Sequence, residues 1–434
     1  QTVTINGLDG TNDAASITAN NAVTLDLAEG AGGANDIDLL TLSGGSNDVV
    51  FTIGDAASAM DITLAGSKSV TVSLEANDAD DLILTDSTTA GTTTLTLASG
   101  GGLAVDLTAA NADVVNIATD VNNDVSFNDS QDVTVSADSQ TSLAFTQGNG
   151  NDGTLELTLS QTGTDKTFAG LTVTSNEFAE LDINAGDLKV TSLSVDASAS
   201  DNDADVTIVG TNDIGGSNVL AGDGNVVISS NSVVLTGNVT GANIDIDTTN
   251  EVTFVAATAT NDSIDILAGA KITGNDVSAT GGAGNDVTLA GEWMAIENDI
   301  AGDDITIDMT NDSRASTVDG IDAANDITIS GGTITVANDI DSEAGDITIQ
   351  TAASVSVDDM AGDVITISGA TVFAANDTEA TSGITITSTC DVDLGTVAAT
   401  VINGGAATGD ITLDNIVADN AITIVTGSSA DTIT

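Results

Sequence analysis

The chain contains no histidine, no proline and no tyrosine, and it has one tryptophan and one cysteine among its 434 residues. Without histidine, a serine or cysteine nucleophile has no imidazole base to activate it, so we do not expect acyl-transfer catalysis. The lone Cys390 can form neither an intrachain disulfide nor a CxxC metal site. The absence of proline is compatible with stacked strands, since each strand then keeps every backbone N–H.

Positive charge is almost missing as well. Sixty-six acidic residues stand against five basic ones, for a formal net charge of −61. So negative a field repels nucleic acid and anionic membranes, and we expect neither as a partner. No apolar run approaches the ~20 residues that span a bilayer. Divalent cations or a high-salt medium suit such a surface; the alternative is that acidity only keeps a β-rich chain soluble.

What the chain has in abundance is short segments that alternate apolar and polar residues, most often as Ile-Thr-Ile. They begin at Ile62, Val287, Ile305, Ile327, Ile347, Ile365, Ile384, Ile411 and Ile422. From Val287 to Ile384 the steps are 18, 22, 20, 18 and 19 residues. A period near 20, with Gly, Asn, Asp and Ser between the segments, is typical of a solenoid.

The alternation explains why the chain repeats itself. In Ile-Thr-Ile the two Ile side chains point to one face of the strand and Thr to the other. One short strand cannot bury its Ile pair, but a coil can bury the pair of the coil below. The sequence therefore predicts an all-β protein, a parallel β-solenoid with ~20-residue coils. The alternative is an array of antiparallel β-sandwich domains.

The regularity of the repeat varies along the chain. Residues 1–150 predict an irregular β-solenoid or β-rich region, residues 151–200 a transition region, and residues 201–434 a regular β-solenoid with DITI-type repeats. The transition region is marked by a cluster of phenylalanines and by Lys166 and Lys189.

Two groups of residues are candidates for specific sites. Aspartates precede several of the repeated strands, and stacking would place them in a column of like charges that Ca²⁺ could neutralise. They are Asp286, Asp304, Asp326, Asp346 and Asp410. The alternative is that they are ordinary turn residues. Trp293 and Met294 interrupt the Val/Ile/Thr pattern and are candidates for a contact with a neighbouring subunit, the alternative being that they fill an irregular coil.

Several stretches resemble bacterial secreted β-strand-repeat proteins. "GGAGNDVTL" (Gly281–Leu289) follows the calcium-binding nonapeptide of RTX proteins up to Asp286 and departs from it at Thr288. Ser192–Gly216 and Thr426–Thr434 resemble segments of RTX-type S-layer proteins, and the DITI ladder is similar to repeats of filamentous-haemagglutinin-like β-solenoids. The resemblance implies secretion, a β-solenoid fold and a role at the cell surface. It implies no ligand.

Both ends of the chain have the alternation of a strand, and uncapped strands pair with other molecules. We therefore expect a secreted structural protein that self-assembles into a filament, sheath or surface layer bridged by divalent cations. Gln1 in place of a Met is compatible with a removed signal peptide. The alternative is an adhesin stalk or binding rod at the cell surface, with a cell-surface polysaccharide as a further candidate partner.

Two other functions are disfavoured. "AGDD" (Ala301–Asp304) resembles the paired aspartates of polygalacturonases, but the aromatic platforms and the histidine of such sites are missing, so we do not expect an enzyme. A column of stacked Thr side chains would suit ice binding, but each repeat presents mostly one Thr.

Overall fold

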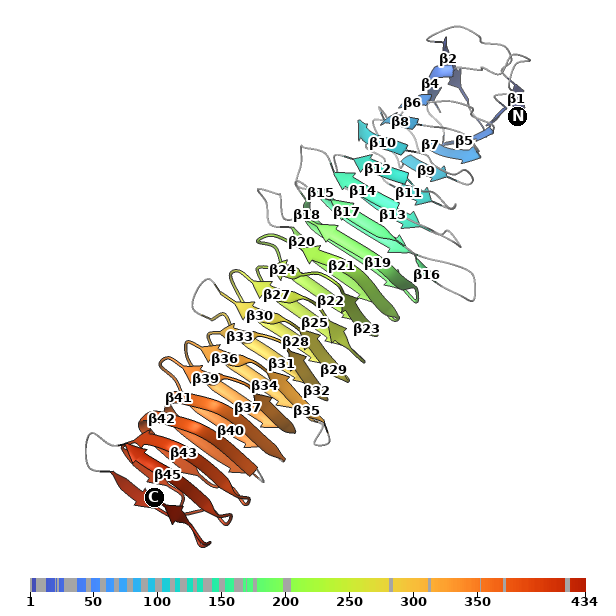
Figure 1. Cartoon of the computed structure of the whole chain (residues 1–434). Helices are drawn as coiled ribbons and strands as arrows, with labels where there is room; N and C mark the ends of the chain where they lie inside the picture. Colours follow the sequence, from blue (N-terminus) through green and yellow to red (C-terminus); the bar gives the residue numbers. More distant parts are fainter. Residues whose placement is uncertain are drawn as a thin grey trace. The chain divides into compact units, whose positions relative to one another are not determined.

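The computed structural model of the chain describes residues 204–280, 284–310, 314–351, 353–369, 372–417 and 422–434, and in the first 203 residues the strands β1 to β19 with a few residues beside them. The described residues form strands and no helix, and so include no helix long and apolar enough to cross a membrane. The chain divides into two compact units, Gln1–Ser230 and Asn231–Thr434 (Figure 1).

In the first unit each coil contributes two strands, so that strands pair with the second one along the chain. One sheet contains β1 (Thr2–Thr4), β3 (Val23–Asp26), β5 (Val49–Gly54), β7 (Val70–Glu75), β9 (Thr93–Leu97), β11 (Val114–Ile117), β13 (Gln131–Val135), β15 (Gly153–Leu159), β18 (Phe178–Gly186), β20 (Asp205–Gly210) and β22 (Val226–Ser230). The other contains β2 (Asp13–Thr18), β4 (Ile37–Ser43), β6 (Met60–Ala65), β8 (Asp81–Asp86), β10 (Ala104–Ala109), β12 (Asn123–Phe127), β14 (Leu143–Gln147), β16 (Thr167–Phe168), β17 (Leu171–Thr174), β19 (Lys189–Asp196) and β21 (Asp213–Leu220).

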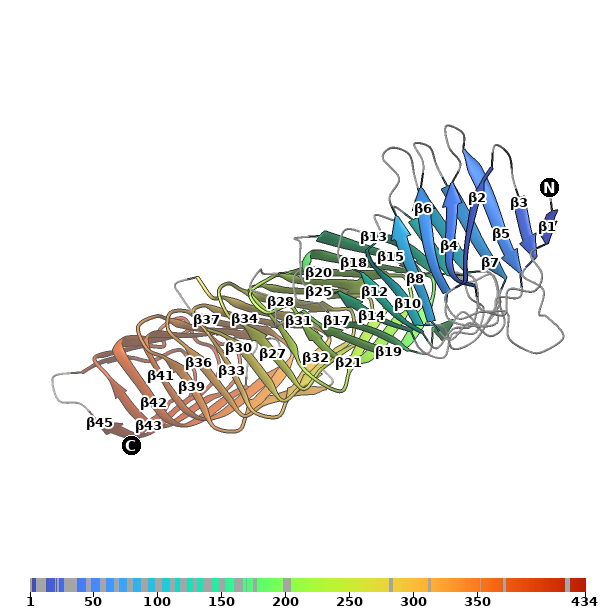
Figure 2. The ribbon, with the colours of Figure 1, turned by 90° about the horizontal axis from the view of Figure 1, so that it is seen from above.

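In the second unit each coil contributes three strands, which form three parallel sheets (Figure 2). The first contains β25 (Ile244–Thr248), β28 (Ile264–Ala268), β31 (Val287–Gly291), β34 (Ile305–Met309), β37 (Ile327–Gly331), β40 (Ile347–Thr351), β44 (Val401–Asn403) and β46 (Thr423–Val425). The second contains β23 (Ser232–Leu235), β26 (Val252–Thr253), β29 (Lys271–Gly274), β32 (Trp293–Ile296), β35 (Ala315–Val318), β38 (Thr333–Val336) and β47 (Thr432–Ile433). The third contains β24 (Val239–Gly241), β27 (Ala256–Ala259), β30 (Asp276–Ala279), β33 (Asp299–Gly302), β36 (Gly320–Ala323) and β39 (Asp339–Ser342).

Four longer strands turn the corners without a break and join more than one of these sheets. They are β41 (Ser354–Gly369), β42 (Val372–Ile386), β43 (Val392–Ala399) and β45 (Ile411–Val417). In β41, for example, Val355 pairs with Ile334 of the second sheet, Met360 with Ile340 of the third and Ile365 with Ile347 of the first.

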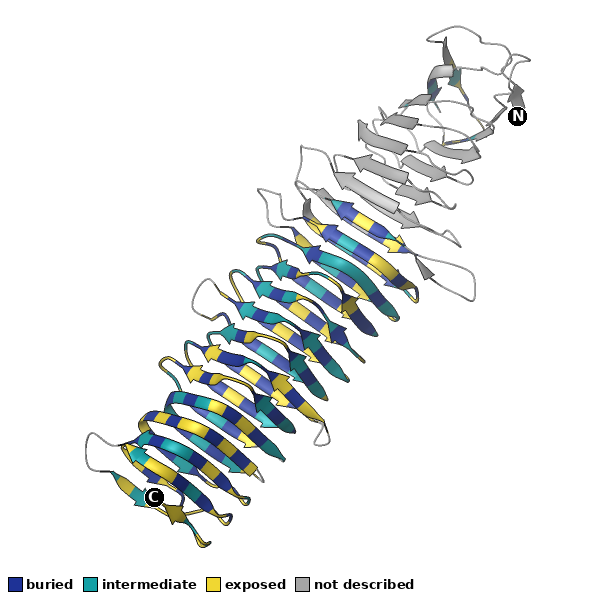
Figure 3. Cartoon of the chain, viewed as in Figure 1, coloured by how far each residue is buried: buried dark blue, intermediate teal, exposed yellow. Residues whose placement is uncertain are grey.

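The core of the second unit is a set of aliphatic columns. Ile305, Ile327 and Ile347 follow one another in register, and each is buried. Outward and inward residues alternate along the strands, which gives the banding in Figure 3. The coils on either side thus cover each short strand. Apolar side chains that one strand alone would leave in water are buried by the equivalent side chains of these coils.

The predicted fold is confirmed. All strand pairs in the described parts are parallel and repeat about every 20 residues, as in the pairs Ile307↔Ile329 and Ile329↔Ile349, so the antiparallel sandwich array is excluded. The division into two units falls after Ser230, and the changes in regularity predicted near residues 150 and 200 stay a prediction. Gly331 has a φ of 98° where the chain leaves the first sheet, and a Cβ there would meet the carbonyl oxygen of Met309.

Candidate functional site

The outward side chains of the second unit define three long surfaces, one for each sheet. We call them the Thr face (first sheet), the neutral face (second sheet) and the acidic face (third sheet). On the Thr face six threonines stand in register over consecutive coils. They are Thr288, Thr306, Thr328, Thr348, Thr366 and Thr385. The predicted Thr column therefore exists, and its neighbours two residues along are a mixed set that includes Asp308, Ser330 and Gln350.

An aspartate ladder runs along the corner before the Thr face and consists of Asp286, Asp304, Asp326 and Asp346. The backbone N–H of each later member donates a hydrogen bond to an Oδ1 of the member one coil earlier, at 3.3, 2.9 and 2.8 Å along the ladder. The N–H of Val364 donates to Asp346 in the same way, at 3.2 Å. A hydrogen bond from a backbone N–H to an ionised carboxylate is stronger than one to a neutral acceptor. These bonds therefore offset part of the repulsion between the stacked carboxylates.

Asp410 does not belong to this ladder, and the prediction that it continues the same column is wrong. Ile411 pairs with Val392, which belongs to the neutral-face sheet and not to the Thr-face sheet. Asp410 instead lies between Asp391, whose Oδ1 accepts its backbone N–H at 3.1 Å, and Ala430, whose N–H it accepts at 3.1 Å. The chain thus has a second, shorter ladder at another corner.

Calcium binding by these aspartates stays a prediction. Their Oδ1 atoms accept backbone N–H groups of the next coil, which accounts for the column without a metal. In the parts of the chain that the structure describes, no three acidic or thiol side chains are grouped so that they could hold a metal ion.

The acidic face carries carboxylates in register on consecutive coils. Asp339 pairs with Asp359, and Asp359 with Asp377. Desolvation by partial burial and the carboxylates of Asp358, Asp377 and Asp339 raise the pKa of Asp359, although an N–H of Asp377 opposes the shift. These side chains line a shallow groove of about 280 Å³.

Asp341, on the same face, has the same environment. Partial burial and the carboxylates of Asp322, Glu343 and Asp339 raise its pKa. Neighbouring carboxylates therefore contribute to a raised pKa at two positions of the acidic face, Asp341 and Asp359, on consecutive coils. Asp363 shows the opposite effect, because hydroxyl groups of Ser382 and Thr381 donate hydrogen bonds to its carboxylate and lower its pKa.

The neutral face contains the residues that the sequence singled out as an interruption. Trp293 is half-buried, and its ring lies beneath two cations, with its centroid 5.1 Å from Cζ of Arg314 and 6.0 Å from Nζ of Lys271. Lys271 also forms an ion pair with Glu251 at 3.2 Å. Met294 points the other way and is fully buried in the core, so the prediction that it contacts a neighbouring subunit is wrong.

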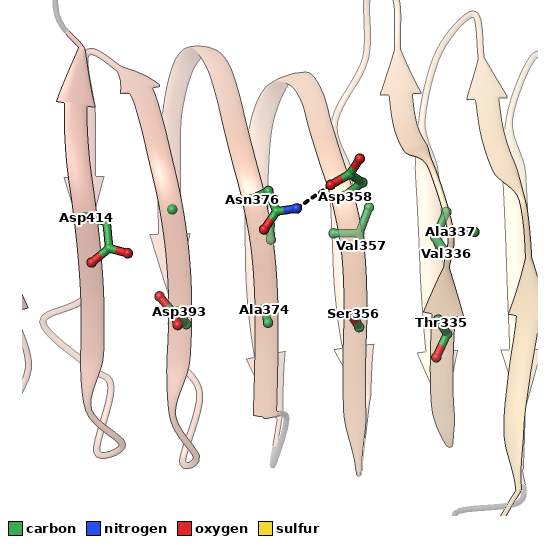
Figure 4. A pocket seen from close by; sticks show the side chains of 12 residues that line it. Thr335, Val336, Ala337, Ser356, Val357, Asp358, Ala374, Asn376, Asp393 and Asp414 are labelled. Atoms are coloured by element: carbon green, nitrogen blue, oxygen red, sulfur yellow. Dashed lines mark hydrogen bonds between the residues drawn. The ribbon is translucent and has the colours of Figure 1, made fainter.

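A groove of about 340 Å³ crosses the neutral face toward the corner with the acidic face (Figure 4). Thr335, Ser356 and Ala374 lie along it on successive coils, and Asp393 and Asp414 lie at its far end. At the corner, the side-chain amide of Asn376 donates a hydrogen bond to the carboxylate of Asp358. The lining offers hydroxyl, amide and carboxylate groups, which suit a hydroxyl-rich ligand better than an apolar one.

No family model, no curated protein and no solved structure matches this chain. The β-solenoid fold itself is compatible with a structural or adhesin-like rod.

The sequence pointed to the Thr column, to four members of the aspartate ladder and to Trp293. It missed the acidic face, whose strands, such as β36 and β39, have one buried Ile each and no Ile-Thr-Ile phrase. Aligning the coils beneath one another would have revealed that Asp339, Asp359 and Asp377 share a column.

Proposed function

We propose that the protein is an extracellular structural protein whose copies associate laterally into a filament, sheath or surface layer, with divalent cations bridging acidic surfaces. The observation that carries the proposal is the row Asp339, Asp359 and Asp377. Like charges held one coil apart, about 4.8 Å, repel one another, and a bound cation or a cationic partner relieves that repulsion.

The form of the surface supports the same reading. A flat face with a repeat of one coil presents the same chemistry many times, so that one weak contact between two copies is multiplied along their length. Calcium accepts six to eight oxygen ligands in flexible geometry. Carboxylates of the row, together with water and oxygen groups of a facing molecule, provide such a shell.

The test is negative-stain electron microscopy of the purified protein in millimolar calcium and after chelation. Ordered filaments or sheets that dissolve on chelation are the expected result. Assemblies that ignore chelation would keep the polymer and refute cation bridging. Isolated molecules under both conditions would refute self-assembly.

A variant with Asp339→Asn, Asp359→Asn and Asp377→Asn should lose calcium-dependent assembly, because the row loses the carboxylates that would hold the cation. The matched control carries Asp262→Asn, Glu292→Gln and Glu297→Gln, which removes the same charge at exposed positions elsewhere in the second unit. Equal behaviour of the two variants would show that total charge matters and the row does not.

A second candidate function is an adhesin that binds a cell-surface polysaccharide. The groove of about 340 Å³ in Figure 4 favours it, because hydroxyl, amide and carboxylate groups line it. The test is calorimetry with neutral polysaccharides on protein that stays dispersed. Binding that Asn376→Ala weakens would favour this function over self-assembly.

A further inference from the structure

Charge is separated between the faces of the second unit. From β29 to the start of β42, the outward positions of the neutral-face strands carry no Asp or Glu. They are Lys271, Thr273, Trp293, Ala295, Ala315, Thr317, Thr333, Thr335, Ser354, Ser356, Val372 and Ala374. The outward positions of the acidic face over the same coils include eight acidic residues. They are Asp276, Asp299, Asp322, Asp339, Asp341, Asp359, Asp377 and Glu379.

The neutral face also holds two of the chain's five basic residues. Arg314 directly precedes β35, and its guanidinium stacks over Trp293. In the described part of the chain, no carboxylate lies within ion-pair distance of it, whereas Lys271 has Glu251 at 3.2 Å. A stacked guanidinium keeps its N–H donors free in the plane of the group, which is the geometry that a carboxylate binds.

We propose that the neutral face of one copy docks against the acidic face of a second copy, with Arg314 and Lys271 receiving carboxylates of the partner. This inference rests on the proposed self-assembly and specifies which surfaces meet. Contact between two acidic faces would add to a repulsion that already raises the pKa values there, while two neutral faces would leave the guanidinium without an acidic partner. The pairing of unlike faces avoids both costs.

The pairing also sets the symmetry of the assembly. Two different patches meet, so the contact is heterologous. One copy keeps an unused acidic face and the other keeps an unused neutral face. Such a contact propagates into rows or rings. It does not stop at a two-fold dimer, which would need one patch to meet itself.

The test uses two charge reversals, Arg314→Glu on the neutral face and Asp359→Lys on the acidic face, at constant calcium. Both side chains reach the surface, and far-UV circular dichroism checks that the coils remain folded. We expect each variant alone to need at least a tenfold higher concentration for assembly, measured by sedimentation. Arg314→Gln removes the charge without reversing it and should give a smaller shift in the same direction.

An equimolar mixture of the two reversals is the decisive sample. The Asp359→Lys copy retains an intact neutral face and the Arg314→Glu copy an intact acidic face, so association should return. Lys189→Glu, the same charge change on a lysine of the first unit that pairs with Asp213 at 3.4 Å, should assemble as the unmodified protein does.

The outcomes separate the two proposals. Reversal variants that assemble like the unmodified protein, or a mixture as dispersed as its components, would overturn the pairing of unlike faces and leave self-assembly standing. An unmodified protein that stays dispersed at every calcium concentration would overturn self-assembly, and this contact with it.

Discussion

Replacement of Asp326 by Asn separates the two forces that act on the aspartate ladder. Asp326 donates its backbone N–H to Asp304 at 2.9 Å and accepts that of Asp346 at 2.8 Å. The amide oxygen of Asn preserves the acceptor and removes the charge. The substitution therefore removes the repulsion between Asp326 and its two neighbours, which stabilises the fold. It also weakens the hydrogen bond that residue 326 accepts, which destabilises the fold.

Both effects can be given a size. Unit charges about 4.8 Å apart repel by about 0.9 kcal/mol in water, so two neighbours contribute about 1.7 kcal/mol before screening. With a Debye length of about 30 Å at 0.01 M salt most of this remains, and with about 3 Å at 1 M roughly a fifth remains. A hydrogen bond to a charged group exceeds a neutral one by about 1 kcal/mol. Asp326→Asn should therefore stabilise the protein by about 0.5 kcal/mol in 0.01 M salt and destabilise it by a similar amount in 1 M salt.

Urea unfolding followed by far-UV circular dichroism, at both salt concentrations, measures this change of sign. Urea is uncharged and leaves the screening unaltered. Asp262→Asn is the control, because Asp262 is an exposed residue outside the aspartate ladder. An effect of the same sign at both salt concentrations, or one equal to that of the control, would refute the reasoning.

Three further predictions use the same unfolding measurement. Ile329→Ala, at a fully buried position of the Thr-face sheet, should cost about 2 to 5 kcal/mol, and a loss below 1 kcal/mol would contradict the stacked core. Gly331→Ala should cost about 3 kcal/mol or more because its Cβ would clash with the carbonyl oxygen of Met309. Gly284→Ala, with a φ of 96° and nothing within 4 Å of the new Cβ, should cost about 1 kcal/mol. Equal costs would show that backbone conformation alone decides. Asp341 has a pKa raised by partial burial and neighbouring carboxylates, so its ionisation opposes folding once the pH exceeds the unfolded-state pKa. Asp341→Asn should therefore raise the urea midpoint at pH 7 and lose that gain at about pH 3, where the carboxyl is protonated in both states, and a gain independent of pH would exclude this cause.

Much of the fold could be predicted because the Thr-face sheet has a strict pattern. Ile305, Ile327 and Ile347 occupy equivalent positions in sequence and in the structure. The same pattern misled at Ile411, whose segment lies in another sheet. Each coil contains several short alternating segments, and only the pairing of backbones decides which one stacks on which. Ile402 continues the column of Ile384 but went unrecognised, since Asn403 occupies the usual Thr position.

The candidate sites also combine features that the sequence pattern reveals with features that depend on how the coils stack. Trp293 and Met294 are adjacent, and alternation dictates that only one of them faces outward; which one depends on the register of β32 with β29. The aspartate ladder was visible as a spacing, but its hydrogen bonds depend on where the next coil's N–H groups lie. The separation of charge between faces becomes visible in the sequence only when the coils are aligned in the register in which they stack.

The three-strand coil has a further consequence for how such a protein can change in evolution. Duplication of one segment of about 20 residues inserts a whole coil and lengthens the Thr, neutral and acidic faces by the same step. Neither the order of the faces nor the charge per unit length is altered. Gene length can therefore vary between lineages while the chemistry of each face is inherited unchanged.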